Sequence, residues 1–146
     1  MKPKMFIALC CLAAACGGKP AKEVAPPPPK PPTLQIDGNA RLSDDVVPTA
    51  YRLDLQIEPD QETFKGWTEI DISVKAETQG IHLHAEELQI KKAVLVAGKK
   101  ELTPDVQQGE NNGLGLAFVE PVAPGDYTLK FAYEAPLNEV PTGLYR

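Results

Sequence analysis

Residues 41–57 read RLSDDVVPTAYRLDLQI, and the second half of this stretch alternates between apolar and polar side chains. The apolar positions fall at every second residue: Tyr51, Leu53, Leu55 and Ile57. Successive side chains of a strand point to opposite faces, so this period of two predicts a half-buried β-strand. Pro48 precedes the alternation, where its missing N–H does not disturb a strand ladder.

Short segments of the same kind follow, separated by turn residues. We predict further strands at residues 67–76, 81–85, 88–96, 101–103, 114–119 and 127–133. Residues 59–62 (PDQE) have hairpin chemistry, so the first two strands are expected to pair antiparallel. Since no window keeps a helical period, the pattern predicts an all-β fold, an antiparallel β-sandwich or a saddle-shaped bent sheet. Leu55 and Leu129 are predicted core residues.

The composition limits the classes of function. The chain has 146 residues, enough for one domain, and its formal net charge of −5 disfavours nucleic acid as a partner. Its three cysteines lie at positions 10, 11 and 16, so a domain beginning after them has no disulfide. A thiolate metal site and a catalytic cysteine are excluded in that domain for the same reason.

The N-terminal residues resemble an export signal. Residues 1–16 read MKPKMFIALCCLAAAC, in which two lysines precede an apolar run. The run is shorter than the roughly 20 residues that span a bilayer, so we interpret residues 1–15 as a signal peptide. The alanines before Cys16 resemble a bacterial lipobox, although Ala13 stands where leucine is commonest. Lipidation of Cys16 is therefore predicted, with an ordinary cleaved signal or a buried N-terminal helix as the alternatives.

A proline-rich stretch separates Cys16 from the predicted strands. Residues 19–32 read KPAKEVAPPPPKPP, a composition that favours extended polyproline II. We assign residues 16–40 to a lipidated cysteine and a disordered linker, which could reach on the order of 50 Å between residues 17 and 32. A PxxP ligand for an aromatic groove is the alternative. Gly17 after the cysteine favours the outer membrane of a bacterial cell envelope as the location.

Residues 41–146 resemble the N-terminal β-domain of the aminopeptidase N family, which are zinc exopeptidases of the gluzincin type. The stretches that carry the resemblance occur in the order of the family: residues 41–55, 64–66, 81–90, 125–133 and 137–145. The resemblance implies a saddle-shaped β-domain that packs beside a catalytic domain and helps to close its substrate cleft. It also implies a full-length relative that removes N-terminal residues from peptides, with zinc polarising the scissile carbonyl and its bound water.

The chain departs from the family in its catalytic motifs. An HExxH motif needs glutamate directly after histidine, but Leu83 follows His82 and Ala85 follows His84. A GxMxN motif needs a methionine, and both methionines lie in the signal, at positions 1 and 5. No catalytic or metal-binding residue is therefore carried over, and we expect zinc only in the catalytic domain of relatives. Because relatives continue where this sequence stops, a fragment, a truncated frame or a split gene is predicted.

Other candidate sites are weaker. His82 and His84 share a strand face near Glu86 and could hold a metal, but a solvated face is favoured. The acidic pairs at residues 44–45 and 86–87 would point to opposite faces if each lay in a strand, so neither is expected to share a proton. Gly113-Leu114-Gly115 is interpreted as a turn, because no helix start or lysine follows as in a phosphate loop.

Two hypotheses of function remain. In the first, the chain is a lipid-anchored N-terminal domain of an aminopeptidase N-like zinc metallopeptidase, inactive alone, with the membrane and a catalytic domain as partners. In the second, it is a complete lipoprotein whose β-sandwich is a non-enzymatic binding or structural module.

Overall fold

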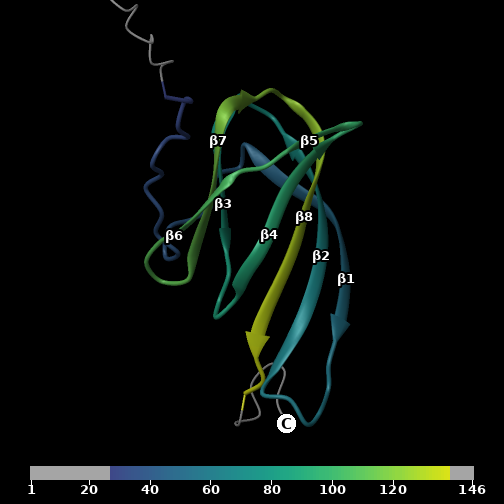
Figure 1. The fold of residues 1–146 in the computed structure, drawn as a ribbon. Coiled ribbons are helices and arrows are strands. Elements are labelled where there is room, and N and C mark those ends of the chain that lie inside the picture. The colour runs from purple at the N-terminus through teal and green to yellow at the C-terminus, as the bar shows by residue number, and fades with distance from the viewer. Residues whose placement is uncertain (1–26, 139–146) are drawn as a thin grey trace, which may run out of the picture.

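The computed structural model describes residues 27–138, which form eight β-strands in two antiparallel sheets (Figure 1). The strands are β1 (Val46–Gln56), β2 (Thr63–Val74), β3 (Thr78–His84), β4 (Gln89–Ala97), β5 (Lys100–Leu102), β6 (Asp105–Gln108), β7 (Gly113–Val122) and β8 (Gly125–Pro136). One sheet has the order β1-β2-β8-β4-β5, and the other has the order β3-β7-β6. No helix within residues 27–138 is long and apolar enough to cross a membrane.

The larger sheet is built around two long strands, β2 and β8. They pair along their whole length, from Thr63 opposite Pro136 to Val74 opposite Gly125. On the other side of β2, β1 pairs antiparallel with it and forms the edge of the sheet, with a bulge between Pro48 and Ala50. The predicted hairpin between the first two strands is therefore confirmed.

The core lies between the two sheets and is mostly aliphatic. From the larger sheet, Leu95 and Leu129 are fully buried, and they face each other across β4 and β8. From the smaller sheet, Ile81 and Leu116 are equally buried and are paired across β3 and β7. The period of two is clearest in β2, whereas β7 is buried at six consecutive positions from Gly113 to Phe118. The predicted all-β antiparallel sandwich is confirmed.

The turns use the residues that their backbone requires. Gly98 adopts φ 61° between β4 and β5, a left-handed conformation that glycine takes without strain. Asn111 and Asn112 adopt φ 52° and 63° between β6 and β7, which confirms the predicted turn. The Gly113-Leu114-Gly115 segment is not a turn, however: it is the beginning of β7. Glycines in that strand leave its outer face without side chains, and another part of the chain packs there.

The structure differs from the sequence-based prediction at the N-terminal boundary. The predicted linker reaches Ala40, but contacts with the sandwich already begin at Pro32, whose carbonyl accepts a hydrogen bond from Gln107. The segment after Pro32 lies along the outer side of the smaller sheet beside β6 (Figure 1). The domain therefore begins earlier than the predicted boundary at Arg41. The predicted signal peptide, Cys16 and the first part of the linker, residues 17–26, lie outside the described residues.

Candidate docking surface and the polar network behind it

The apolar face of β1 is not covered. Tyr51 is paired with Ile70, and Leu53 with Thr68, so both side chains lie on the face of the larger sheet that carries the core. The side chain of Tyr51 is 65% exposed and that of Leu53 is 62% exposed. These values show that the smaller sheet does not extend over this edge. Ile57, just after the strand, is also exposed. We call Tyr51, Leu53 and Ile57 the β1 strip.

This exposure corrects one prediction. The alternation along β1 is real, but the expected burial of one face is wrong, because of its four apolar positions only Leu55 is packed against the core. A period of two shows which residues share a face, and it does not show whether anything lies over that face.

A small apolar cavity adjoins the β1 strip. Thr68 and Ile70, the cross-strand neighbours of Leu53 and Tyr51, line a cavity of about 100 Å³ between the two sheets. Its other walls come from both sheets: Leu83, His84, Ala85, Leu88, Ile90, Leu114, Phe131 and Tyr133. The Thr68 hydroxyl donates to the Tyr133 hydroxyl at 3.2 Å, so polar groups at its edge are paired. Thr68 and Ile70 therefore lie between the β1 strip and the cavity on the same face of the larger sheet.

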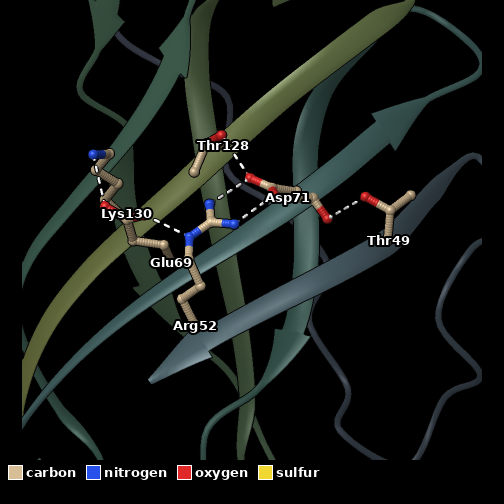
Figure 2. A network of polar contacts seen from close by, with 6 residues as sticks. All are labelled: Thr49, Arg52, Glu69, Asp71, Thr128 and Lys130. Atoms are coloured by element: carbon tan, nitrogen blue, oxygen red, sulfur yellow. Dashed lines mark hydrogen bonds and ion pairs between the residues drawn. The ribbon is translucent and has the colours of Figure 1, made fainter. Parts of the chain in front are cut away.

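The opposite face of the same strands carries a network of charges (Figure 2). Arg52 of β1 donates two hydrogen bonds to the Asp71 carboxylate, each at 2.8 Å, and a third to Glu69 at 2.9 Å. Lys130 of β8 binds the other oxygen of Glu69 at 2.7 Å. The Thr128 hydroxyl donates to Asp71 at 2.8 Å, so the network joins β1, β2 and β8.

The network keeps its carboxylates ionised. Hydrogen bonds from Arg52 and then Thr128 lower the pKa of Asp71 to about 2, and those from Lys130 and then Arg52 lower the pKa of Glu69. Because these pKa values are depressed, the stability contributed by Asp71 is present above its ordinary pKa near 4 and is lost as the pH falls through about 2. Two cations and two anions pair with each other here, so the network connects the edge strand β1 to β2 and β8.

The predicted histidine pair does not form a metal site. His84 Nε2 lies 2.6 Å from the carbonyl oxygen of Gly38, and because a carbonyl can only accept, this nitrogen carries the hydrogen. His82 lines an open groove of about 880 Å³ beside residues 33–37. In the described part of the chain, no group of three His, Cys, Asp or Glu side chains could hold a metal ion. These residues therefore do not provide the donor set that zinc needs.

The two acidic pairs lie in turns, not in strands. Asp44 is paired with Arg41 at 3.3 Å, and Asp45 accepts a hydrogen bond from the Ser43 hydroxyl at 2.7 Å. Residues 86–87 form the turn between β3 and β4, where Glu87 adopts φ 54°. The side-chain partners of Asp44 and Asp45 are local, whereas the Asp45 carbonyl accepts a hydrogen bond from the Lys75 amide at 2.7 Å, just after β2.

Sequence patterns alone do not reveal the β1 strip or the network. The network side chains occupy outward positions of three strands that are neighbours in space, but β8 is far from β1 and β2 in the sequence. The signal that could indicate it is the run of opposite charges at alternate positions: Arg52, Glu69, Asp71 and Lys130. That signal becomes useful only once the strand order is known.

Comparison with known proteins agrees with this architecture. Residues 47–146 match the Peptidase M1 N-terminal domain. The chain is 32% identical over 114 residues to endoplasmic reticulum aminopeptidase 1 of Rattus norvegicus, a match that covers 74% of this chain and 12% of the relative. It is 28% identical over 100 residues to aminopeptidase N of Acetobacter pasteurianus, covering 68% of this chain and 28% of the relative.

The chain thus spans a minor part of the length of both relatives, at most 28%. Membership of the family implies zinc in a catalytic domain, while the described residues here supply a β-sandwich with an open apolar edge. The predicted resemblance is confirmed, and the chain belongs to the M1 aminopeptidase family as an N-terminal domain.

Proposed function

We propose that this chain is the lipid-anchored N-terminal β-domain of an aminopeptidase N-like zinc peptidase, and that it docks on the catalytic domain through the β1 strip. The observation that carries the proposal is the exposure of Tyr51 and Leu53 on a face that is elsewhere buried core. Exposed apolar surface of this kind, next to a cavity, is typical of protein interfaces.

A catalytic domain is the occupant that the comparisons favour. Both relatives are named aminopeptidases, and each extends far beyond the part that this chain matches. A neighbouring domain that covers the β1 strip would add apolar contact where the smaller sheet stops. The network on the other face would hold β1 in place while that contact forms, since Arg52 connects the edge strand to both carboxylates of β2.

The domain would then take part in peptide hydrolysis by shaping the substrate cleft, without supplying a reacting group. The catalytic domain would supply the zinc, which polarises the scissile carbonyl and activates water in this chemistry. This chain would supply a rigid wall beside the cleft and thereby limit which peptides reach the metal. Its charged groups around Asp71 are engaged with one another, so we assign them to the support of that wall.

The anchor is the second part of the proposal. Cys16 would carry the acyl chains, and the proline-rich stretch would hold the domain away from the membrane surface. Gly17, directly after the cysteine, favours the outer membrane of a bacterial cell as that membrane. Two or more acyl chains give stable anchoring, whereas one is marginal. The peptides cleaved would then be those that reach the cell envelope.

Substitutions on the two faces of the larger sheet test the docking surface. With the β-domain and the catalytic domain produced as separate chains, Tyr51→Ala combined with Leu53→Ala should lower the aminopeptidase activity that co-precipitates with the β-domain by at least about tenfold, because loss of a central apolar contact weakens binding by about 1.4 kcal/mol or more. Trp67→Ala is the matched control, since Trp67 is exposed on the opposite face, across from Asp54. Full activity in the double variant, or equal loss in the control, would contradict the proposed docking surface.

A further inference from the structure

Residues 32–38 form an extended segment on the outer face of the smaller sheet. Leu34 and Ile36 are half-buried there, while Thr33, Gln35 and Asp37 between them are exposed. The side chains that face the sheet therefore alternate as they do in a strand. Asp37 also forms a parallel bridge with Glu110, and the Gly38 amide donates to the Glu110 carbonyl at 3.0 Å.

The sheet is shaped to receive these two side chains. A Cβ on Gly115 would lie 2.5 Å from the Ile36 Cδ1 atom, and one on Gly80 would lie 2.6 Å from the Leu34 Cδ2 atom. Real Cβ atoms do not approach other atoms so closely, so Leu34 and Ile36 occupy the space that side chains at these glycines would fill. Gly113, predicted from the sequence to lie in a turn, also leaves space for Ile36, because a Cβ added there would lie 2.7 Å from Ile36 Cγ2.

Polar groups from three parts of the smaller sheet hold the backbone of the segment. The Gln107 side chain of β6 donates to the Pro32 carbonyl at 2.9 Å and accepts from the Leu34 amide at 2.8 Å. His84 of β3 donates to the Gly38 carbonyl. The Asn111 side chain, from the β6–β7 turn, donates to the Asp37 carboxylate at 3.0 Å. A segment held by both apolar packing and backbone hydrogen bonds is part of the fold and not a free linker.

We propose that residues 32–38 are a latch that fixes the point at which the N-terminal tether leaves the β-domain, at β6 and away from β1. Without the latch, the tether would join the domain directly at the start of β1, the strand that carries the β1 strip. In Figure 1 the segment lies beside β6 at the left, whereas β1 runs down the right-hand edge of the molecule. The consequence for orientation at a membrane rests on the proposed lipid anchor: a domain held from β6 leaves the β1 strip free for its partner.

Hydrogen exchange in the full chain, kept in detergent solution, tests whether the latch is closed. The Leu34 and Gly38 amides should exchange at least about tenfold more slowly than the Lys30 amide, because both donate hydrogen bonds. Leu34→Asp combined with Ile36→Asp should remove this protection. Thr33→Asp combined with Gln35→Asp adds the same charge on the exposed side and should preserve it. Equal exchange at Leu34 and Lys30 in the unmodified chain would overturn the proposal.

A second variant covers the case in which the buried charges unfold the smaller sheet. Gln107→Ala removes the two side-chain hydrogen bonds to the latch and leaves unchanged the glycines, Gly80, Gly113 and Gly115, against which Leu34 and Ile36 pack. It should accelerate exchange at Leu34 while the amides of β8 remain protected. Unchanged exchange at Leu34 in this variant would show that Gln107 does not hold the latch.

The exit point is measured directly with a nitroxide on an unnatural amino acid at position 30. The spin label should broaden the amide signal of Val106 in β6 and leave that of Leu53 in β1 sharp, and opening the latch with the Leu34→Asp, Ile36→Asp pair should abolish this difference. Broadening at Leu53 in the unmodified chain would overturn the proposal. None of these measurements depends on acylation of Cys16. The proposed latch can therefore be disproved while the proposed lipid anchor stands, and the reverse.

Discussion

Leu129→Ala is expected to lower the free energy of unfolding by about 2–5 kcal/mol, because it truncates a side chain at the centre of the core. Leu129 is fully buried in the middle of β8, where it is paired with Ile70 on one side and Leu95 on the other. Truncation would leave a cavity between the sheets that these neighbours can fill only in part. Since small domains are stable by only about 5–15 kcal/mol, much of the population could unfold at growth temperature.

Urea denaturation followed by circular dichroism measures this effect. Leu53→Ala is the matched control, because it removes the same atoms from a side chain that is 62% exposed, and its loss should stay near about 0.5 kcal/mol. Leu55→Ala should lie between the two, since Leu55 is half-buried against the core. A similar loss at Leu53 and Leu129 would mean that the β1 strip is covered within the isolated domain, contrary to the structure.

Cys16→Ser is expected to release the protein from the membrane. Acyl chains contribute about 0.8 kcal/mol for each CH₂ group buried in the bilayer, so loss of the proposed acylation site would take away the proposed anchor. The variant should incorporate no labelled palmitate and should move from the membrane pellet to the soluble or secreted fraction. Mass spectrometry of the N-terminus reports the same change independently of the fractionation.

The other two cysteines provide the control for this prediction. Cys10→Ser combined with Cys11→Ser leaves the proposed lipobox cysteine in place, so acylation and membrane association should persist. Labelled palmitate on the Cys16→Ser protein, or retention of that variant in the membrane with a processed N-terminus, would show that the attachment is elsewhere. Separation of inner and outer membranes by density then tests the prediction, based on Gly17 after the cysteine, that the protein lies in the outer membrane.

The sequence predicts the local structure well and the tertiary surroundings poorly. Alternation places β2 and β8 close to their observed positions, and the Asn111-Asn112 turn is predictable because few residue types tolerate positive φ. The short strand β6 escapes prediction, since Asp105–Gln108 has a single apolar residue and pairs only because β7 is beside it. Strand order depends on contacts distant in sequence, which periodicity does not contain.

The errors at the candidate sites have the same origin. Tyr51 and Leu53 follow a pattern that usually indicates burial, but an edge strand extends beyond the smaller sheet. The prolines before residues 33–37 favour a linker there, although the alternation of Leu34 and Ile36 and the paired glycines Gly113 and Gly115 are visible in the sequence. The match between these two patterns becomes evident only when the sheet brings the glycines beneath the apolar side chains.

Activity measurements on the native protein test most directly whether this β-domain belongs to a zinc aminopeptidase without supplying its reacting groups. An antibody against the domain should precipitate, from detergent-solubilised cells, material that hydrolyses aminoacyl reporter substrates and loses this activity with a zinc chelator. The purified recombinant chain of 146 residues, supplied with zinc, should show no turnover. Chelator-sensitive hydrolysis by the recombinant chain alone, or native precipitate without any such activity, would contradict the account.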